Sequence, residues 1–165
     1  MISDEIRARF DREVAKYPSE RKQSAVMACL SIMQDVEGWV SPDAERAVAE
    51  YLNMPAIAVH EVTTFYNMFN QQPVGKFKLN VCTNLPCQLR GGFKAIEHLQ
   101  ERLGIQAGQT TSDGCFTLQE CECLGACADA PVMLVNDRKM LSYMTHERLD
   151  ELLNDLRTLA QEASS

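Results

Sequence analysis

The sequence predicts an α+β protein, in which a helical bundle at residues 1–72 precedes an α/β domain with a four-stranded sheet at residues 73–165. Three observations support this prediction. Apolar residues recur at helical spacing as far as about Phe69. From Phe77 they alternate with polar residues, as in a strand with one buried face. Two short cysteine clusters then follow in the alternating half, at positions where strands are expected to end.

The first half contains signals for four helices with short connections. Apolar residues spaced four apart mark the first helix, which is expected to end near Pro18. Ser19 is expected to cap the second helix and Gly38 to close it. Ser41 and Pro42 read as an N-cap and a first helical residue, and they open the third helix. The residues expected to face the core of this bundle are Ile6, Phe10, Val14, Val26, Cys29, Leu30, Met33, Val48, Tyr51, Leu52, Val59, Val62 and Tyr66.

The second half begins with a strand that starts at Phe77 and ends at Cys82. Cys87 lies close to the start of the next element, a single helix that Gly104 terminates. The pair Gly91–Gly92 falls inside this helix. Its apolar stripe comprises Leu89, Phe93, Ile96, Leu99 and Leu103. The positive end of the helix dipole is expected to lower the thiol pKa of Cys87.

Three further strands and a closing helix complete the second half. The expected segments are a strand at Cys115–Glu122, a loop at Cys123–Cys127, a strand at Val132–Val135, a hairpin turn at Asn136–Asp137 and a strand at Lys139–Tyr143. Thr145 is expected to cap the closing helix, whose leucines recur at helical spacing. Strand, helix, strand, two paired strands and helix is a thioredoxin-like order.

Composition and charge narrow the possible functions. Sixteen basic against twenty-three acidic residues give a net charge of −7, without the basic stripe that a nucleic-acid binder needs, so nucleic acid is not an expected ligand. The start of the chain lacks the features of a signal peptide, and no apolar run of eighteen residues occurs. We therefore expect a cytoplasmic chain that reaches a membrane only through partners. No phosphate-binding glycine motif occurs, so the chain is not expected to bind nicotinamide or flavin by itself.

Four cysteines in two clusters are the strongest functional signal. Cys82 and Cys87 form a C-x4-C pair, and Cys123 and Cys127 form a C-x3-C pair, with thirty-five residues between the pairs. Turn-forming residues separate the cysteines of each pair, so their sulfurs can converge on a metal. Zinc sites usually have cysteines two to four residues apart, whereas C-x4-C opens the plant-type ferredoxin ligand set. The spacing favours an iron–sulfur cluster over zinc.

Two alternatives compete with that interpretation. A four-cysteine zinc site would only fasten the two loops together, as in an interaction module. A dithiol oxidoreductase is suggested by the place of Cys82 and Cys87 at a strand-to-helix junction, but it needs closer spacing and has no use for the second pair. Of the other cysteines, Cys29 and Cys115 are expected to be structural. Cys121 is ambiguous because it lies only two residues before Cys123.

The chain also resembles a known family along nearly its whole length. The resemblance is carried by the C-x4-C pair and by segments Glu122–Cys127 with Ala130–Pro131, Glu61–Tyr66, Gln72–Lys76 and Gly108–Gly114. These segments are similar to those of the E-subunit family, or 24 kDa-type family, of NADH:quinone oxidoreductase, respiratory complex I. Corresponding subunits of NAD-linked formate dehydrogenases and NAD-reducing hydrogenases belong to the same wider family, so both are alternative hosts.

The resemblance implies a thioredoxin-like ferredoxin that carries one 2Fe-2S cluster. The ligands it implies are Cys82, Cys87, Cys123 and Cys127. It favours Cys123 over Cys121, because the family places its ligand directly before Leu124. It implies an electron-transfer subunit whose partners are a flavin- and NADH-binding subunit and further subunits of the same complex, at the inner face of a bacterial cell membrane. No catalytic residue is expected in this chain, and residues 1–72 are expected to serve docking.

Overall fold

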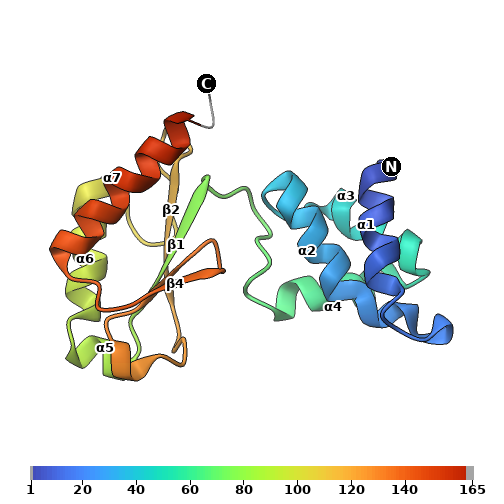
Figure 1. Cartoon of the computed structure of the whole chain (residues 1–165), viewed down its shortest axis with the longest axis horizontal. Helices are drawn as coiled ribbons and strands as arrows, with labels where there is room; N and C mark the ends of the chain where they lie inside the picture. The colour runs from blue at the N-terminus through green and yellow to red at the C-terminus, as the bar shows by residue number, and fades with distance from the viewer. Residues whose placement is uncertain (1, 163–165) are drawn as a thin grey trace. The chain divides into compact units, whose positions relative to one another are not determined.

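The computed structural model describes residues 2–162, and the chain divides into two compact units, Met1–Pro73 and Val74–Ser165. The first unit is helical, and the second contains a four-stranded sheet with helices (Figure 1). Each unit has its own cluster of buried apolar side chains. The expected α+β class is therefore confirmed. Within residues 2–162, no helix combines the length and the apolar character that crossing a bilayer requires.

Four α-helices and one 3-10 segment build the first unit. Their bounds are α1 Asp4–Val14, η1 Ser19–Ala25, α2 Val26–Glu37, α3 Pro42–Leu52 and α4 Ala56–Phe65. The expected start of the third helix is confirmed, since the Ser41 hydroxyl accepts a hydrogen bond from the Ala44 N–H at 3.0 Å. Gly38 closes α2 in the left-handed conformation at φ 82°, which glycine adopts without the strain that a side chain would add.

The prediction that Ser19 caps the second helix is wrong. The segment that it opens is η1, in which Arg21 leaves the helical region (φ −123°, ψ 28°), and α2 begins only at Val26. Tertiary contacts compensate for the missing cap. Lys22 and Gln23 donate from η1 to backbone carbonyls at the C-terminal end of α3. These contacts join segments about thirty residues apart, so a local capping pattern could not reveal them.

Apolar side chains of all four helices meet in the core of the first unit. Its fully buried large residues are Phe10, Leu30, Val48, Leu52 and Val59. Cys29 is also fully buried there, as expected. Tyr66 departs from its expected core position, because it follows α4 in an extended conformation and is 39% exposed. Phe69 is buried a little further along the chain instead.

The second unit is built on a mixed sheet in the order β2-β1-β3-β4. The strands are β1 Phe77–Cys82, β2 Phe116–Cys121, β3 Met133–Val135 and β4 Lys139–Leu141. β1 pairs with β2 in parallel and with β3 antiparallel, and β3 pairs with β4 antiparallel. The tight turn between β3 and β4 has positive φ at Asn136 (53°) and Asp137 (54°), which confirms the expected hairpin turn.

Two helices lie on one side of this sheet (Figure 1). They are α6 Gly92–Leu103 and α7 His146–Glu162. Leu99 of α6 and Leu149 and Leu153 of α7 are buried against Leu79 and Leu118 of the sheet. Burying a leucine side chain is worth about 1.5–3 kcal/mol, so this layer is the main apolar core of the unit. Thr145 accepts a hydrogen bond from the N–H of Arg148, as expected for the cap of α7.

The single helix expected after the first cysteine pair is wrong. The structure has two helices, α5 Leu85–Leu89 and α6, separated at Arg90 and Gly91. Gly91 adopts φ 94°, a left-handed conformation that breaks the helical path. As a result Leu89 is 78% exposed and Phe93 is 42% exposed, rather than part of the stripe that faces the sheet.

Candidate metal centre

All four predicted ligands lie at or beyond the carboxyl ends of two neighbouring strands. Cys82 is the last residue of β1, and its register partner on β2 is Cys121, the last residue of that strand. Because β1 and β2 are parallel, the loops that leave them begin at the same edge of the sheet. The first loop leads into α5, which contains Cys87, and the second carries Cys123 and Cys127.

The first cysteine pair is buried. Cys82 and Cys87 are each 1% exposed, and they share a small apolar cluster with Ala130 and Val132. The Cys82 N–H donates to the Val132 carbonyl at 3.1 Å, which holds the end of β1 against the segment before β3. After burial and the opposing Val132 backbone, the neighbouring Cys82 thiol contributes to raising the pKa of the Cys87 thiol. The first pair is thus fixed in position by the packed interior of the unit.

The second cysteine pair lies nearer to solvent. The sulfurs of Cys123 and Cys127 are 3.4 Å apart, and Cys123 is exposed. Gly125, between them, turns the chain at φ 77°. A hydrogen bond from the Gly125 backbone, followed by one with Cys127, lowers the pKa of the Cys123 thiol. A contact of this kind between a backbone amide and a sulfur favours the thiolate.

The expected lowering of the Cys87 pKa is wrong, because the pKa of this thiol is raised. Cys87 is the third residue of the five-residue helix α5, and it is buried. Burial raises the pKa of its thiol, while a backbone hydrogen bond with Val132 opposes this and the neighbouring Cys82 adds to it. A short helix supplies little dipole, so desolvation prevails. A metal ion that bound this thiol would have to displace its proton.

Cys121 lies closer to the first pair than the sequence indicated. It is directly opposite Cys82 in the sheet register, and it packs against the cluster that contains Cys82 and Cys87. Burial, followed by the influence of Cys82, raises the pKa of its thiol to about 12. Cys115, the other cysteine expected to be structural, packs against the core between the sheet and its helices.

Side chains that the sequence analysis did not single out connect the two cysteine loops. The Thr83 hydroxyl donates to the Glu120 carboxylate at 3.0 Å, and the Asn84 amide donates to the Glu122 carboxylate at 2.7 Å. The Thr83 N–H also donates to the Cys121 carbonyl. Each bond joins the loop after β1 to the end of β2 or the residues just beyond it. The polar residues beside both cysteine motifs were the feature of the sequence that could have indicated these bonds.

The donor set fits a 2Fe-2S cluster. The four predicted ligands form two pairs, one in the buried cluster of Cys82 and Cys87 and one in which the Cys123 and Cys127 sulfurs are 3.4 Å apart. The pKa of Cys127 is raised chiefly by the bond with Cys123, but also by Cys82 on the other loop, so the two pairs lie within electrostatic reach. Thiolates in two pairs match a cluster of two irons that has four cysteine ligands.

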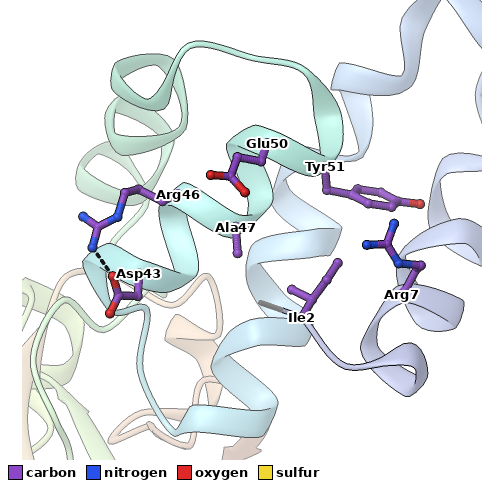
Figure 2. Close-up of a pocket in the computed structure, with 7 residues that line it drawn as sticks. All are labelled: Ile2, Arg7, Asp43, Arg46, Ala47, Glu50 and Tyr51. Carbon is purple, nitrogen blue, oxygen red and sulfur yellow. Dashed lines mark hydrogen bonds and ion pairs between the residues drawn. The ribbon is translucent and has the colours of Figure 1, made fainter.

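The first unit contains a separate hollow of about 760 Å³ between α1 and α3 (Figure 2). Ile2 and Ala47 supply apolar surface, and the Arg7 guanidinium lies over the Tyr51 ring at 5.9 Å from its centroid. The remaining residues that line it are the ion pair of Arg46 and Asp43, together with Glu50. Tyrosine and arginine are enriched in protein–protein contacts, whereas acidic residues such as Asp43 and Glu50 belong to the polar rim of such a contact.

Comparison with known proteins places this architecture in a family. Residues 10–157 match the family model of the thioredoxin-like [2Fe-2S] ferredoxins. The chain is 42% identical over 145 residues to the E subunit of the NADH-quinone oxidoreductase of Rickettsia bellii, which covers 87% of this chain and 86% of the relative. It is 38% identical over 148 residues to NADH-quinone oxidoreductase subunit 2 of Thermus thermophilus, covering 90% and 82% of the two chains.

A solved structure shares the fold at lower sequence identity. The crystal structure of an air-oxidised NAD+-reducing [NiFe]-hydrogenase matches with a TM-score of 0.70 and 21% identity. The match covers 82% of this chain and only 23% of the hydrogenase chain, so this chain spans about a quarter of the length of that protein. The thioredoxin-like fold expected from the order of the elements is confirmed.

Proposed function

This chain belongs to the family of thioredoxin-like [2Fe-2S] ferredoxins, and from that premise we propose that it is the electron-transfer subunit of an NADH:quinone oxidoreductase. Its cofactor is one 2Fe-2S cluster. When bound, such a cluster accepts and donates one electron at a time. The partner that exchanges electrons with it is the flavin-containing, NADH-oxidising subunit of the same complex. The names of the relatives at 42% and 38% identity support this assignment.

The arrangement of the four cysteines is the observation that carries the proposal. We assign Cys82, Cys87, Cys123 and Cys127 as the cluster ligands. One pair is buried in an apolar cluster and the other is near the surface. The buried pair excludes water from one side of the site, and the outer pair leaves a short path to a docked partner. A redox centre that reacts with another protein needs both properties, whereas a zinc site that only joins two loops needs neither.

Hydrogen bonds around the four cysteines support the electron-transfer role in this proposal. The Thr83 and Asn84 bonds to the β2 side hold the two loops at a fixed separation, so the ligands need little rearrangement when the charge of the site changes. The Gly125 backbone bond stabilises negative charge on Cys123. These contacts adjust the reduction potential, because hydrogen bonds to sulfur and solvent exposure are among its determinants.

The helical unit serves docking in this proposal. Its hollow between α1 and α3 would receive a side chain of the flavin subunit, and the rim charges would add specificity. The chain would therefore lie on the peripheral arm of the complex, at the inner face of the cell membrane. The alternative host complex is a hydrogenase or a formate dehydrogenase, in which the chain would have the same electron-transfer role. The fold shared with a NAD+-reducing hydrogenase supports this alternative.

Purification without oxygen tests the function and its alternatives together. The full chain, tagged, expressed in its native host and purified without oxygen, should yield a red-brown complex. Metal and sulfide analysis of this chain produced alone and purified without oxygen should give two irons and two sulfides per chain. Mass spectrometry of the co-purifying proteins should identify a flavin subunit with quinone-oxidoreductase partners. Hydrogenase or formate dehydrogenase subunits would establish the alternative host, and a colourless chain with one zinc would refute the electron-transfer role.

A further inference from the structure

Gly92, the first residue of α6, lies against the backbone of both cysteines of the first pair. A Cβ atom at this position would be 2.8 Å from the Cys82 carbonyl oxygen. It would also be 3.0 Å from the carbonyl carbon and the carbonyl oxygen of Cys87. Gly91, just before it, places the start of α6 there by adopting φ 94°. The absence of a side chain at Gly92 therefore permits a contact between α6 and two predicted ligands.

The atoms that a side chain would meet are backbone atoms, so they cannot move aside as a flexible side chain can. A methyl group at Gly92 would displace the Cys82 peptide, the Cys87 peptide or the N-terminal turn of α6. Cys82 and Cys87 are each 1% exposed, and their surroundings are packed. Displacement of a peptide by a few tenths of an ångström moves the attached sulfur by a similar amount. Such a change alters ligand geometry before it alters the fold.

We propose that Gly92 is a positioning residue for the metal centre. By letting α6 pack directly on the peptides of Cys82 and Cys87, it sets the separation and orientation of the two inner sulfurs. This inference rests on the proposed function, in that both cysteines are taken as ligands. It assigns to Gly92 an effect on the electronic properties of the centre in addition to its contribution to folding.

The chain supplies a matched control in Gly75. A Cβ atom at Gly75 would meet backbone atoms at 2.8, 2.9 and 3.0 Å, but these belong to Phe116 and Cys115 at the start of β2. The proposed cysteine ligands lie at or beyond the opposite ends of β1 and β2. The substitutions Gly92→Ala and Gly75→Ala thus impose similar crowding on the same unit. Only the first of them imposes it on the metal site.

The test compares the full chain, G92A and G75A after anaerobic loading with iron and sulfide. Both variants should unfold at a lower temperature than the unsubstituted chain. Only G92A should shift the g values of the reduced-state EPR signal and the midpoint potential, and it should lose its cluster to a chelator about tenfold faster. An unchanged EPR signal and potential in soluble G92A, or equal shifts in both variants, would overturn the assignment.

A second measurement does not depend on the variants folding. Because coupling is reciprocal, ligation of the inner cysteines should protect the first turn of α6 from hydrogen exchange. In the unsubstituted chain, peptides covering residues 91–95 should exchange more slowly with the cluster than without it, while residues 74–77 change little. Equal exchange with and without the cluster would contradict the positioning role of Gly92, whether or not the G92A variant folds. An unsubstituted chain that never gains a 2Fe-2S EPR signal would instead refute the proposed function.

Discussion

Tyr143 binds Asp129 through both its backbone and its side chain. The Tyr143 N–H donates to the Asp129 carbonyl at 2.9 Å, and the phenol donates to the Asp129 carboxylate at 2.6 Å. Tyr143 adopts φ 54°, an uncommon conformation for an aromatic residue. Asp129 ends the 3-10 turn Cys127–Asp129. The contact thus connects the end of the second cysteine loop to the segment that follows β4.

Replacement of Tyr143 by phenylalanine should loosen the second cysteine loop without unfolding the chain. The hydrogen bond with Asp129 raises the pKa of Tyr143, so the neutral phenol is the stabilising form. Its contribution is complete below the unfolded pKa of about 10 and is lost as pH rises through the raised folded pKa. At pH 7 the variant should release its cluster to a chelator faster than the unsubstituted chain.

The same release assay supplies the pH test and a control for Tyr143. The two release rates should converge as the phenol of the unsubstituted chain ionises above pH 10. Tyr17→Phe, which alters a 40% exposed tyrosine of the helical unit, should leave the release rate unchanged. Equal rates for Tyr143→Phe and the unsubstituted chain at pH 7 would show that the contact does not hold the loop.

Cys123→Ser should remove or severely disturb the cluster, whereas Cys121→Ser should leave it in place. The reason is geometric, since the Cys123 sulfur lies 3.4 Å from that of Cys127 and Cys121 is the sheet neighbour of Cys82. Visible absorption and the reduced-state EPR signal of both variants, loaded in parallel, measure the difference. Equal loss in the two variants, or loss only in the Cys121 variant, would contradict the ligand assignment.

Local signals were sufficient for most of the fold. Ser41 and Pro42 marked the start of α3, and the alternation from Phe77 identified β1, because caps and strand periodicity are local properties. The predictions of helix boundaries were wrong where contacts between distant segments determine the backbone conformation. The stripe from Leu89 to Phe93 looked continuous, yet Gly91 at φ 94° divides it. A glycine pair in a sequence does not reveal which way the chain turns.

The candidate site was predictable in part. Motif spacing singled out four cysteines as candidate ligands, since metal ligands must be near one another in a loop. It could not reveal that burial would raise the pKa of Cys87, because burial depends on Val132 and Ala130, more than forty residues away. Nor could it reveal that Cys121 lies opposite Cys82. That relationship follows from the parallel register of β1 and β2.

Asp137→Asn should destabilise the second unit alone. Asp137 pairs at 2.7 Å with Lys78, whose side chain is 3% exposed, so removal of the carboxylate charge takes a partner from a buried ammonium. Loss of one partner of a buried pair costs about 3–5 kcal/mol, whereas an exposed pair contributes about 0–1 kcal/mol. Asparagine tolerates the φ of 54° at this position, so the turn itself should remain.

The two units provide separate probes of the Asp137 effect. Bleaching of the cluster in urea should occur at a lower concentration in Asp137→Asn. The fluorescence of Trp39, the single tryptophan, reports the first unit and should show an unchanged midpoint. Asp43→Asn, which breaks the exposed pair with Arg46 on α3, is the control and should change neither transition. Equal effects of the two substitutions would show that burial does not strengthen the contribution of the Lys78 pair.

Ala47→Trp should weaken the association of the chain with the flavin subunit and leave the metal centre intact. Ala47 lines the hollow between α1 and α3, and an indole there would occupy space that the partner is proposed to enter (Figure 2). The variant should keep its 2Fe-2S absorption, because all four proposed ligands belong to the other unit. Blocking a central contact typically costs at least 2 kcal/mol of binding free energy, so about thirtyfold weaker binding is expected.

Ala58→Trp places the same indole on α4, outside this hollow, and serves as the control. Titration of each purified chain with the flavin subunit measures the difference, and equal affinities for the Ala47 and Ala58 variants would exclude the hollow as the docking site.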